Sequence, residues 1–218
     1  ILVPAIDLKT SEKILELSAK HEMIYAIIGF HPCDVARLSD KDFQTLEIYF
    51  YESKVVGIGE TGLDYFWDKT YKDKQIDFFR RHIELSEKYD LPIVIHTRDS
   101  IKDAIKIIAE SKSKCSGQFH CFSGDKSDLY DVLNFESYFV SFCGNITYKN
   151  FDAIDVVNET PLDKLLAETD SPFLTPVPHR GKKNQPSFVL NTIDKIAKVK
   201  NIDVKILEEN LEANTRRL

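Results

Sequence analysis

The sequence predicts an α/β fold of the TIM-barrel (β/α)8 type. Short apolar runs alternate with longer charged stretches of helical spacing, and this alternation implies parallel strands with right-handed crossovers. Strands that are buried on both faces read as such unbroken apolar runs. Several runs also end in a histidine or a carboxylate, at the position that faces the active-site end of such a barrel. The expected strands are residues 1–5, 24–30, 55–59, 92–96, 117–120, 138–143 and 165–168.

The stretches between these runs are expected to be helices. Apolar residues recur at helical spacing, as in Ile76, Phe79 and Ile83. Helix starts are indicated by capping residues in Thr10-Ser11-Glu12, Ser39-Asp40 and Asp125-Lys126-Ser127. The segment 171–178 contains three prolines and is expected to be a loop over the barrel mouth. Two helices, at about 187–200 and 203–217, are expected to close the chain.

We expect one domain over residues 1–218, since a chain of this length with 43% hydrophobic residues forms a single large core. Only seven strands are visible, whereas a closed barrel of this type has eight. The first run begins at Ile1, inside an apparent strand. We favour a βα unit that precedes Ile1 and is absent from this sequence over a seven-stranded variant.

Composition excludes several classes of protein. A net charge of −6 argues against a protein that coats duplex nucleic acid by bulk electrostatics. The four cysteines have no C-x-x-C spacing, so neither a zinc ribbon nor a disulfide scaffold is indicated, and a cytoplasmic location is the default. No run approaches the roughly 18 apolar residues of a membrane helix. We expect no membrane association and no obligate protein partner.

Four potential metal ligands follow predicted strands: Glu60, His96, His120 and Asp170. Two imidazoles and two carboxylates suit zinc, manganese or magnesium. Glu168 competes with Asp170, because strand alternation places both on the same side and does not choose between them. No His-x-His occurs anywhere in the chain.

Five ordered motifs resemble those of the TatD family of metal-dependent hydrolases, which have a TIM-barrel fold and include deoxyribonucleases and 3′→5′ exonucleases. The motifs are Gly59-Glu60-Thr61-Gly62-Leu63-Asp64, Ile95-His96-Thr97-Arg98, His120-Cys121-Phe122-Ser123-Gly124, Glu168-Thr169-Asp170-Ser171-Pro172 and Pro178-His179-Arg180-Gly181-Lys182. The resemblance implies that Glu60 bridges two metals and that His96 and His120 bind the second. It also implies that Asp170, rather than Glu168, binds the first metal and helps to activate water. The family's His-x-His, which completes the first metal site, is absent here.

Several further residues are candidate substrate contacts. His31 is expected to face the same mouth, either as a substrate contact or in a structural turn. Arg180, with His179 beside it, offers a planar fork for phosphate oxygens, although a solvated loop is the alternative. Arg98 is a weaker candidate for the same role. The aromatic run 65–67 is either core under a loop or a platform for base stacking, and the sequence does not decide.

These residues together predict a metal-dependent phosphodiester hydrolase, a deoxyribonuclease of the 3′→5′ exonuclease kind, with Glu60 and Asp170 as catalytic residues. Two divalent ions, Mg, Mn or Zn, would activate water against DNA or another phosphodiester. One alternative is an amidohydrolase or phosphoesterase that acts on a small molecule, since fold and ligands alone do not fix the substrate. The other is an inactive barrel that lacks its first metal site.

Overall fold

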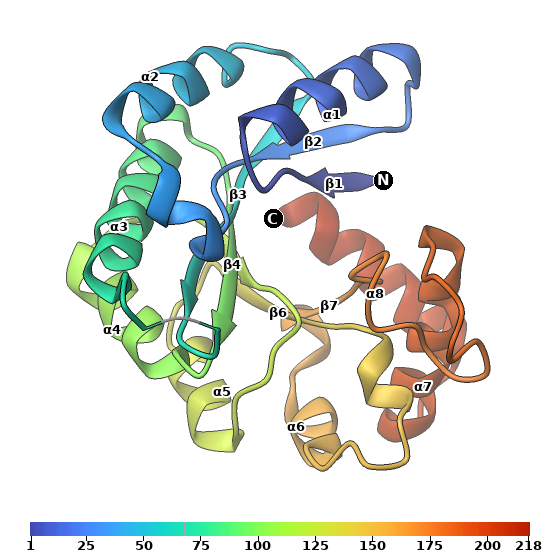
Figure 1. Ribbon diagram of the computed structural model, residues 1–218. Coiled ribbons are helices and arrows are strands. Elements are labelled where there is room, and N and C mark those ends of the chain that lie inside the picture. Colours follow the sequence, from blue (N-terminus) through green and yellow to red (C-terminus); the bar gives the residue numbers. More distant parts are fainter. Residues whose placement is uncertain (68) are drawn as a thin grey trace. The chain divides into compact units, whose positions relative to one another are not determined.

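The structure is a computed structural model that describes residues 1–67 and 69–218. The chain forms two compact units, Ile1–Gln118 and Phe119–Leu218, and each is described by itself below. Strands and helices alternate in both units, which confirms the predicted α/β class (Figure 1). The single domain over residues 1–218 stays a prediction.

The first unit is built on four parallel strands that pair in chain order. Helices connect them, as expected for βα repeats. Strand β5 (Gly117–Phe119) lies at the boundary of the two units. The elements before it are β1 (Leu2–Pro4), α1 (Leu8–Lys20), β2 (Tyr25–Ile28), η1 (Pro32–Arg37), α2 (Asp40–Tyr49), β3 (Val55–Asp64), α3 (Lys72–Tyr89), β4 (Ile93–Arg98) and α4 (Ile101–Ser111).

Strand β3 continues to Asp64, five residues beyond the predicted end. Its second half contains polar residues and glycines that suggest a turn in the sequence, but pairing of residues 61–64 with β4 keeps it extended. Two glycines allow this close approach. A Cβ atom at Gly59 would lie 2.6 Å from the Val94 carbonyl oxygen, and one at Gly62 would collide with the His96 carbonyl oxygen. The glycines therefore bring the end of β3 against the end of β4.

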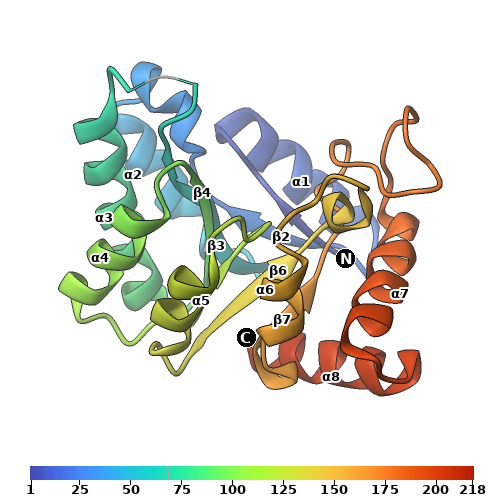
Figure 2. The ribbon, with the colours of Figure 1, turned by 90° about the horizontal axis from the view of Figure 1, so that it is seen from below.

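The second unit contains the parallel pair β6–β7 and the helices that close the chain. Helix α7 packs against α8 (Figure 2). The buried Asn214 side chain of α8 donates to the carbonyl oxygens of Leu162 and Leu165 and so fixes the start of β7. The elements are α5 (Lys126–Leu133), β6 (Tyr138–Phe142), η2 (Gly144–Thr147), α6 (Ile154–Glu159), η3 (Leu162–Lys164), β7 (Leu165–Ala167), η4 (Pro186–Phe188), α7 (Val189–Lys200) and α8 (Val204–Arg217).

Helix caps were predicted in part. Ser39 and Asp125 cap α2 and α5 as expected. Helix α1 begins at Leu8, earlier than predicted, because Asp7 is its N-cap and Thr10 completes the capping box from inside the helix. The two closing helices lie within two residues of their expected starts. The segment before them, which contains the prolines, lies outside regular strands and helices until η4.

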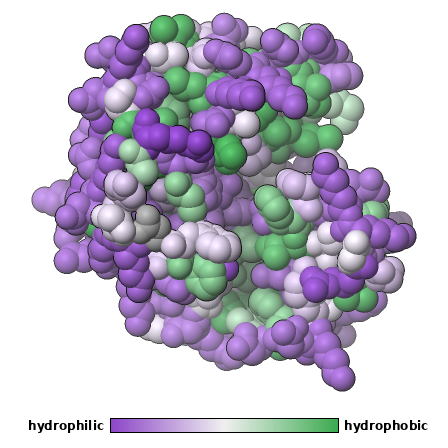
Figure 3. Space-filling view, in the orientation of Figure 1, coloured by the Kyte–Doolittle hydropathy of each residue, from purple (hydrophilic) through white to green (hydrophobic). Residues whose placement is uncertain are grey.

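The exterior is largely polar. The face in Figure 3 is mostly hydrophilic, with apolar side chains in small groups, as expected for a chain with 29% charged residues. Within the described residues, no helix combines the length and the apolarity needed to cross a bilayer. A cytoplasmic location stays a prediction.

Candidate metal centre and active site

In the first unit, Glu60 and Asp64 of β3 lie on either side of His96 of β4. The Glu60 Oε1 atom is 2.9 Å from His96 Nδ1, and the Asp64 Oδ2 atom is 3.1 Å from His96 Nε2. Glu60 and Asp64 are four residues apart on one strand, so strand alternation puts both carboxylates on the same face. Both are buried, whereas His96 is partly accessible.

Asp64 is held firmly in this position. Its Oδ1 atom accepts hydrogen bonds from the backbone N–H groups of Phe66 and Trp67, at 3.0 and 3.2 Å. Its own backbone N–H and carbonyl are paired with the buried Gln75 side chain of α3. Burial opposes ionisation of Asp64, but the hydrogen bonds from His96 and from these backbone groups outweigh it and lower its pKa to about 2. Asp64 is therefore an ionised acceptor for His96 Nε2–H.

This arrangement fits a cation at Glu60 and His96. A neutral His96 that donates Nε2–H to Asp64 turns its Nδ1 lone pair toward a Glu60 oxygen at 2.9 Å. Two lone pairs at this distance repel each other unless a proton or a metal ion lies beside them. A carboxylate that orients a histidine from behind is a recurring feature of metal sites.

His31 lies beside this cluster. The Nε2 atom of His31 is 3.5 Å from Glu60 Oε1, and the ligand atoms of His31, Glu60 and His96 lie within 4.8 Å of one another. His31 is also the N-cap of η1, where its Nδ1 accepts from the Cys33 N–H at 3.2 Å. That bond requires the ring proton on Nε2, facing Glu60. The contact role and the turn role expected for His31 thus occur together.

In the second unit, Glu168 holds His120. The Glu168 Oε2 atom is 2.9 Å from His120 Nδ1. Its Oε1 atom accepts from the Cys121 N–H and from the Ser141 hydroxyl, both at 2.6 Å. Burial opposes ionisation of Glu168, but the charge of His120 and these hydrogen bonds lower its pKa. The contact with Glu168 Oε2 puts a proton of His120 on Nδ1, so Nε2 is the ring atom that would bind a metal once His120 is neutral.

Asp170 follows two residues after Glu168, in the left-handed region with φ 55°. Aspartate adopts this conformation more readily than most side chains, and it turns the chain sharply after β7. The Asp170 carbonyl accepts from the Phe173 N–H at 2.8 Å. Both carboxylate oxygens of Glu168 are already engaged, Oε2 with His120 and Oε1 with the Cys121 N–H and the Ser141 hydroxyl. The choice of Asp170 over Glu168 as the metal ligand stays a prediction.

A pair of cysteines adjoins His120 in this unit. The Sγ atoms of Cys121 and Cys143 lie 2.6 Å apart, and both residues are free thiols. The contact with Cys143 and burial raise the pKa of Cys121. The contact with Cys121 lowers the pKa of Cys143, but burial and nearby carboxylates outweigh it and raise that pKa. In the absence of a metal ion, both groups are therefore protonated at neutral pH.

In the basic loop after Asp170, the two candidate substrate contacts pack against aromatic rings. The Arg180 guanidinium lies over the Tyr148 ring, 3.9 Å from its centroid, and Arg180 is exposed. His179 stacks on Phe188 of η4, with ring centroids 4.0 Å apart. His179 thus has a packing role, while the exposed Arg180 keeps its donors accessible. In the first unit, Arg98 is exposed at the end of β4.

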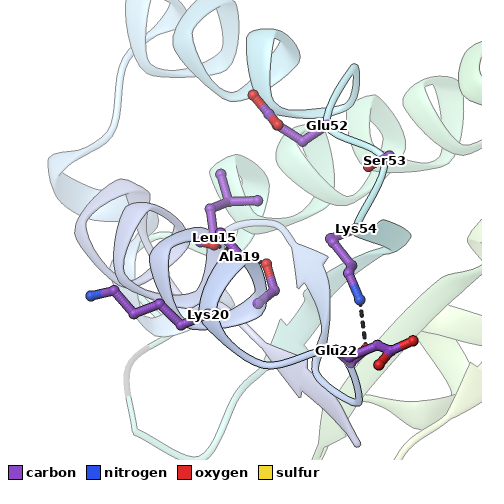
Figure 4. A pocket seen from close by; sticks show the side chains of 8 residues that line it. Leu15, Ala19, Lys20, Glu22, Glu52, Ser53 and Lys54 are labelled. Atoms are coloured by element: carbon purple, nitrogen blue, oxygen red, sulfur yellow. Dashed lines mark hydrogen bonds between the residues drawn. The ribbon is translucent and has the colours of Figure 1, made fainter.

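A cavity of about 550 Å³ lies in the first unit, lined by residues that include Leu15, Glu22, Glu52 and Lys54 (Figure 4). Lys54 donates to the Glu22 carbonyl there, at 2.5 Å. These residues precede β2 and β3, whereas Glu60 and Asp64 occupy the C-terminal half of β3. The cavity is therefore at the opposite end of the strands from the metal-ligand cluster and takes no part in it.

The structure thus groups Glu60, His96 and His31 in one unit and places His120 in the other. Sequence reasoning missed Asp64 and Ser141, and it gave no role to His82. The spacing of Glu60 and Asp64 on one strand was a usable signal for the first. The His82 ring is fully buried in α3 and accepts from the Phe30 N–H at 3.1 Å, one residue before His31.

Comparisons with known proteins agree with this chemistry. A family model described as "TatD related DNase" matches residues 1–218. The chain is 38% identical to the "Uncharacterized metal-dependent hydrolase YabD" of Bacillus subtilis, covering 100% of this chain and 86% of the relative. It is 35% identical to the hydrolase of the same description, YcfH, from Escherichia coli, over 93% of this chain and 76% of the relative.

A solved structure of a TatD homologue, YJJV from Escherichia coli, superposes with a TM-score of 0.94 at 26% identity, over 100% of this chain and 85% of that one. The predicted TIM-barrel type of fold is confirmed by this match. A TatD family hydrolase from Entamoeba histolytica has a TM-score of 0.87 at 22% identity, over 99% of this chain and 82% of that one, and supports the fold alone.

Proposed function

Because the chain belongs to the family of TatD-related DNases, and because its relatives are named as metal-dependent hydrolases, we propose that it hydrolyses phosphodiester bonds in DNA with divalent metal ions. The observation that carries this proposal is the Glu60–His96 contact backed by Asp64. The Glu60 oxygen and the His96 ring nitrogen are close enough to share a proton or a metal ion, and Asp64 orients the His96 ring through its other nitrogen.

Each unit contains proposed donors for a metal ion. Glu60 Oε1 and His96 Nδ1 are the donors in the first unit, and His120 Nε2 and Asp170 are the donors proposed for the second. Nitrogen and carboxylate donors of this kind suit zinc and manganese, and the carboxylates suit magnesium. Divalent ions bound there would polarise a phosphoryl oxygen and make water a better nucleophile at neutral pH.

The residues of the chain then have distinct tasks. Asp170 orients the attacking water and takes its proton, since Glu168 is committed to His120. His31 presents Nε2–H beside Glu60, where it donates to a phosphoryl oxygen. Arg180, exposed above Tyr148, neutralises part of the charge on the substrate phosphate. His179 supports that loop by stacking on Phe188.

The test is a substrate panel on the full chain with Mg²⁺, Mn²⁺ and Zn²⁺ in turn. We expect hydrolysis of DNA, and we expect Asp170→Asn to lower kcat by about 10²- to 10⁴-fold, the usual contribution of a general base. Asp131→Asn, at an exposed acid of α5, makes the same charge change and should leave kcat unchanged. Cleavage of amides or phosphomonoesters without phosphodiesters, or a fully active Asp170→Asn protein, would overturn the proposal.

A further inference from the structure

Three aromatic residues follow Asp64, and the structure separates them into two kinds. Tyr65 is buried, and its hydroxyl donates to Asp103 at 2.9 Å. Phe66 and Trp67 are 52% and 68% exposed, with their ring centroids 5.1 Å apart and their planes at 89°. The sequence left core and platform as equal alternatives for this run. Tyr65 belongs to the core, whereas two large neighbouring rings are accessible to solvent.

A positively charged side chain lies against these exposed rings. The Arg98 guanidinium lies over the Phe66 ring, 3.7 Å from its centroid, and 5.2 Å from that of Trp67. Within residues 1–67 and 69–218, Arg98 forms no ion pair with a carboxylate. Its backbone is fixed, because its carbonyl accepts from the Tyr65 N–H and its N–H donates to Ser100. Arg98 is exposed, so its charge is accessible to an anion beside the aromatic rings.

Asp64 connects this surface to the metal-ligand cluster. One of its oxygens accepts from the N–H groups of Phe66 and Trp67, and the other accepts from His96. Arg98 and His96 are two residues apart on β4, so they lie on the same face of the strand. The two rings and the guanidinium are thus fixed to the same carboxylate and the same strand as the ligands Glu60 and His96.

We propose that Phe66, Trp67 and Arg98 bind a nucleobase of a single-stranded nucleic acid, next to the phosphodiester that is cleaved. This inference rests on the proposed function, because it names the substrate form that the same site selects. A base can stack on an aromatic ring only when it is outside a duplex, and such stacking tolerates any base. Arg98 contacts the phosphate that adjoins the stacked base. The clamp therefore selects single strands without selecting sequence.

Trp67 is the only tryptophan of the chain, so its fluorescence reports on the platform directly. The binding experiment uses full-length Asp170→Asn protein with Mn²⁺, which limits hydrolysis during the titration. A single-stranded DNA oligonucleotide should quench Trp67 in a saturable way. An abasic oligonucleotide of the same length should not, because it presents the phosphates without rings. Equal quenching by both, or none by either, would overturn the inference.

The kinetic experiment compares cleavage of the same two oligonucleotides in the otherwise native enzyme. Trp67→Ala should lower the ratio of kcat/KM for the base-containing strand to that for the abasic strand by about 5- to 100-fold, mainly through KM. Trp67→Phe keeps an aromatic face and should restore most of the ratio. Tyr51→Ala removes a ring that is 79% exposed before β3, and it should leave the ratio at the wild-type value.

The outcomes separate the two proposals. If the wild-type protein cleaves both strands and Trp67→Ala leaves the ratio unchanged, the platform is refuted and the phosphodiesterase stands. If the wild-type protein cleaves neither strand, the proposed function is refuted, and the Trp67 titration still decides whether the rings bind a base.

Discussion

Replacing Asp64 with asparagine should weaken metal binding by about 10- to 100-fold, the usual effect of losing the group that orients a histidine ligand. The physical reason is the tautomer of His96. An asparagine that accepts the Phe66 and Trp67 N–H groups with its oxygen must turn its NH₂ group toward His96 Nε2. His96 would then carry its proton on Nδ1, facing Glu60, where the cation binds.

The pKa of Asp64 shows how strongly its partners hold it in the charged form that orients His96. The pKa of Asp64 falls from 3.8 to about 2, because its hydrogen bonds outweigh its burial. A pKa lowered this far corresponds to roughly 2 kcal/mol in favour of the charged carboxylate. This stabilisation is complete above pH 3.8 and is lost as the pH falls toward 2, so it is fully present at neutral pH. A 10- to 100-fold loss of affinity is about 1.4 to 2.8 kcal/mol.

The assay is calorimetric titration of the metal-free protein with Mn²⁺ and with Zn²⁺ at pH 7.5. Asp73→Asn is the matched control, since Asp73 is exposed on α3 and the substitution removes the same charge. A dissociation constant within about twofold of wild type for Asp64→Asn would refute the orienting role. Equal weakening by both substitutions would also refute it, because only the total charge would then matter.

Three further predictions concern the second unit, the buried histidine and the metal itself. Glu168→Gln should weaken metal binding about 10- to 100-fold, yet its hydrolysis should remain measurable at saturating metal. Asp170→Asn should stay inactive even at saturating metal. If metal titrations of kcat show the reverse pattern, Glu168 is the catalytic carboxylate and Asp170 is the residue that orients His120. Burial lowers the pKa of His82 from 6.5 to about 4, so its contribution to stability is complete above pH 6.5 and falls by up to ~3 kcal/mol as the pH drops toward 4. Urea unfolding at pH 7.5 and at pH 5 should show that the free energy of unfolding falls less for His82→Gln than for the wild type. An equal fall in both proteins would contradict this assignment. Metal at 100 times its dissociation constant should stabilise the chelator-treated protein by ~2.7 kcal/mol, and a melting temperature unaffected by metal would show that the folded state holds none.

The two histidines proposed as ligands share one design, although they lie in different units. Each has a ring nitrogen against a carboxylate from a different strand or from the residues that follow it: Asp64 for His96, and Glu168 for His120. Each carboxylate is itself fixed by backbone N–H groups. Such fixed acceptors set the tautomer before a metal arrives, which lowers the cost of organising the site.

The sequence by itself determined the strand pattern and the positions of the proposed ligands. Buried parallel strands are recognisable as apolar runs. Polar residues that follow them, such as Glu60, His96 and His120, are noticeable because burying a charged or polar group costs free energy unless it has a partner. The seven runs all contain strands at nearly the expected places, and the family assignment followed from motifs read at those ends.

Only the tertiary structure decided which groups meet. Alternation gives the face of a strand, but the partner across the sheet depends on register, and here Gly59 and Gly62 set how closely β3 approaches β4. Asp64 therefore meets His96, a contact between residues 32 positions apart in sequence. Burial likewise assigned Tyr65 to the core and left Trp67 exposed, because burial depends on packing against helices distant in the chain rather than on residue type.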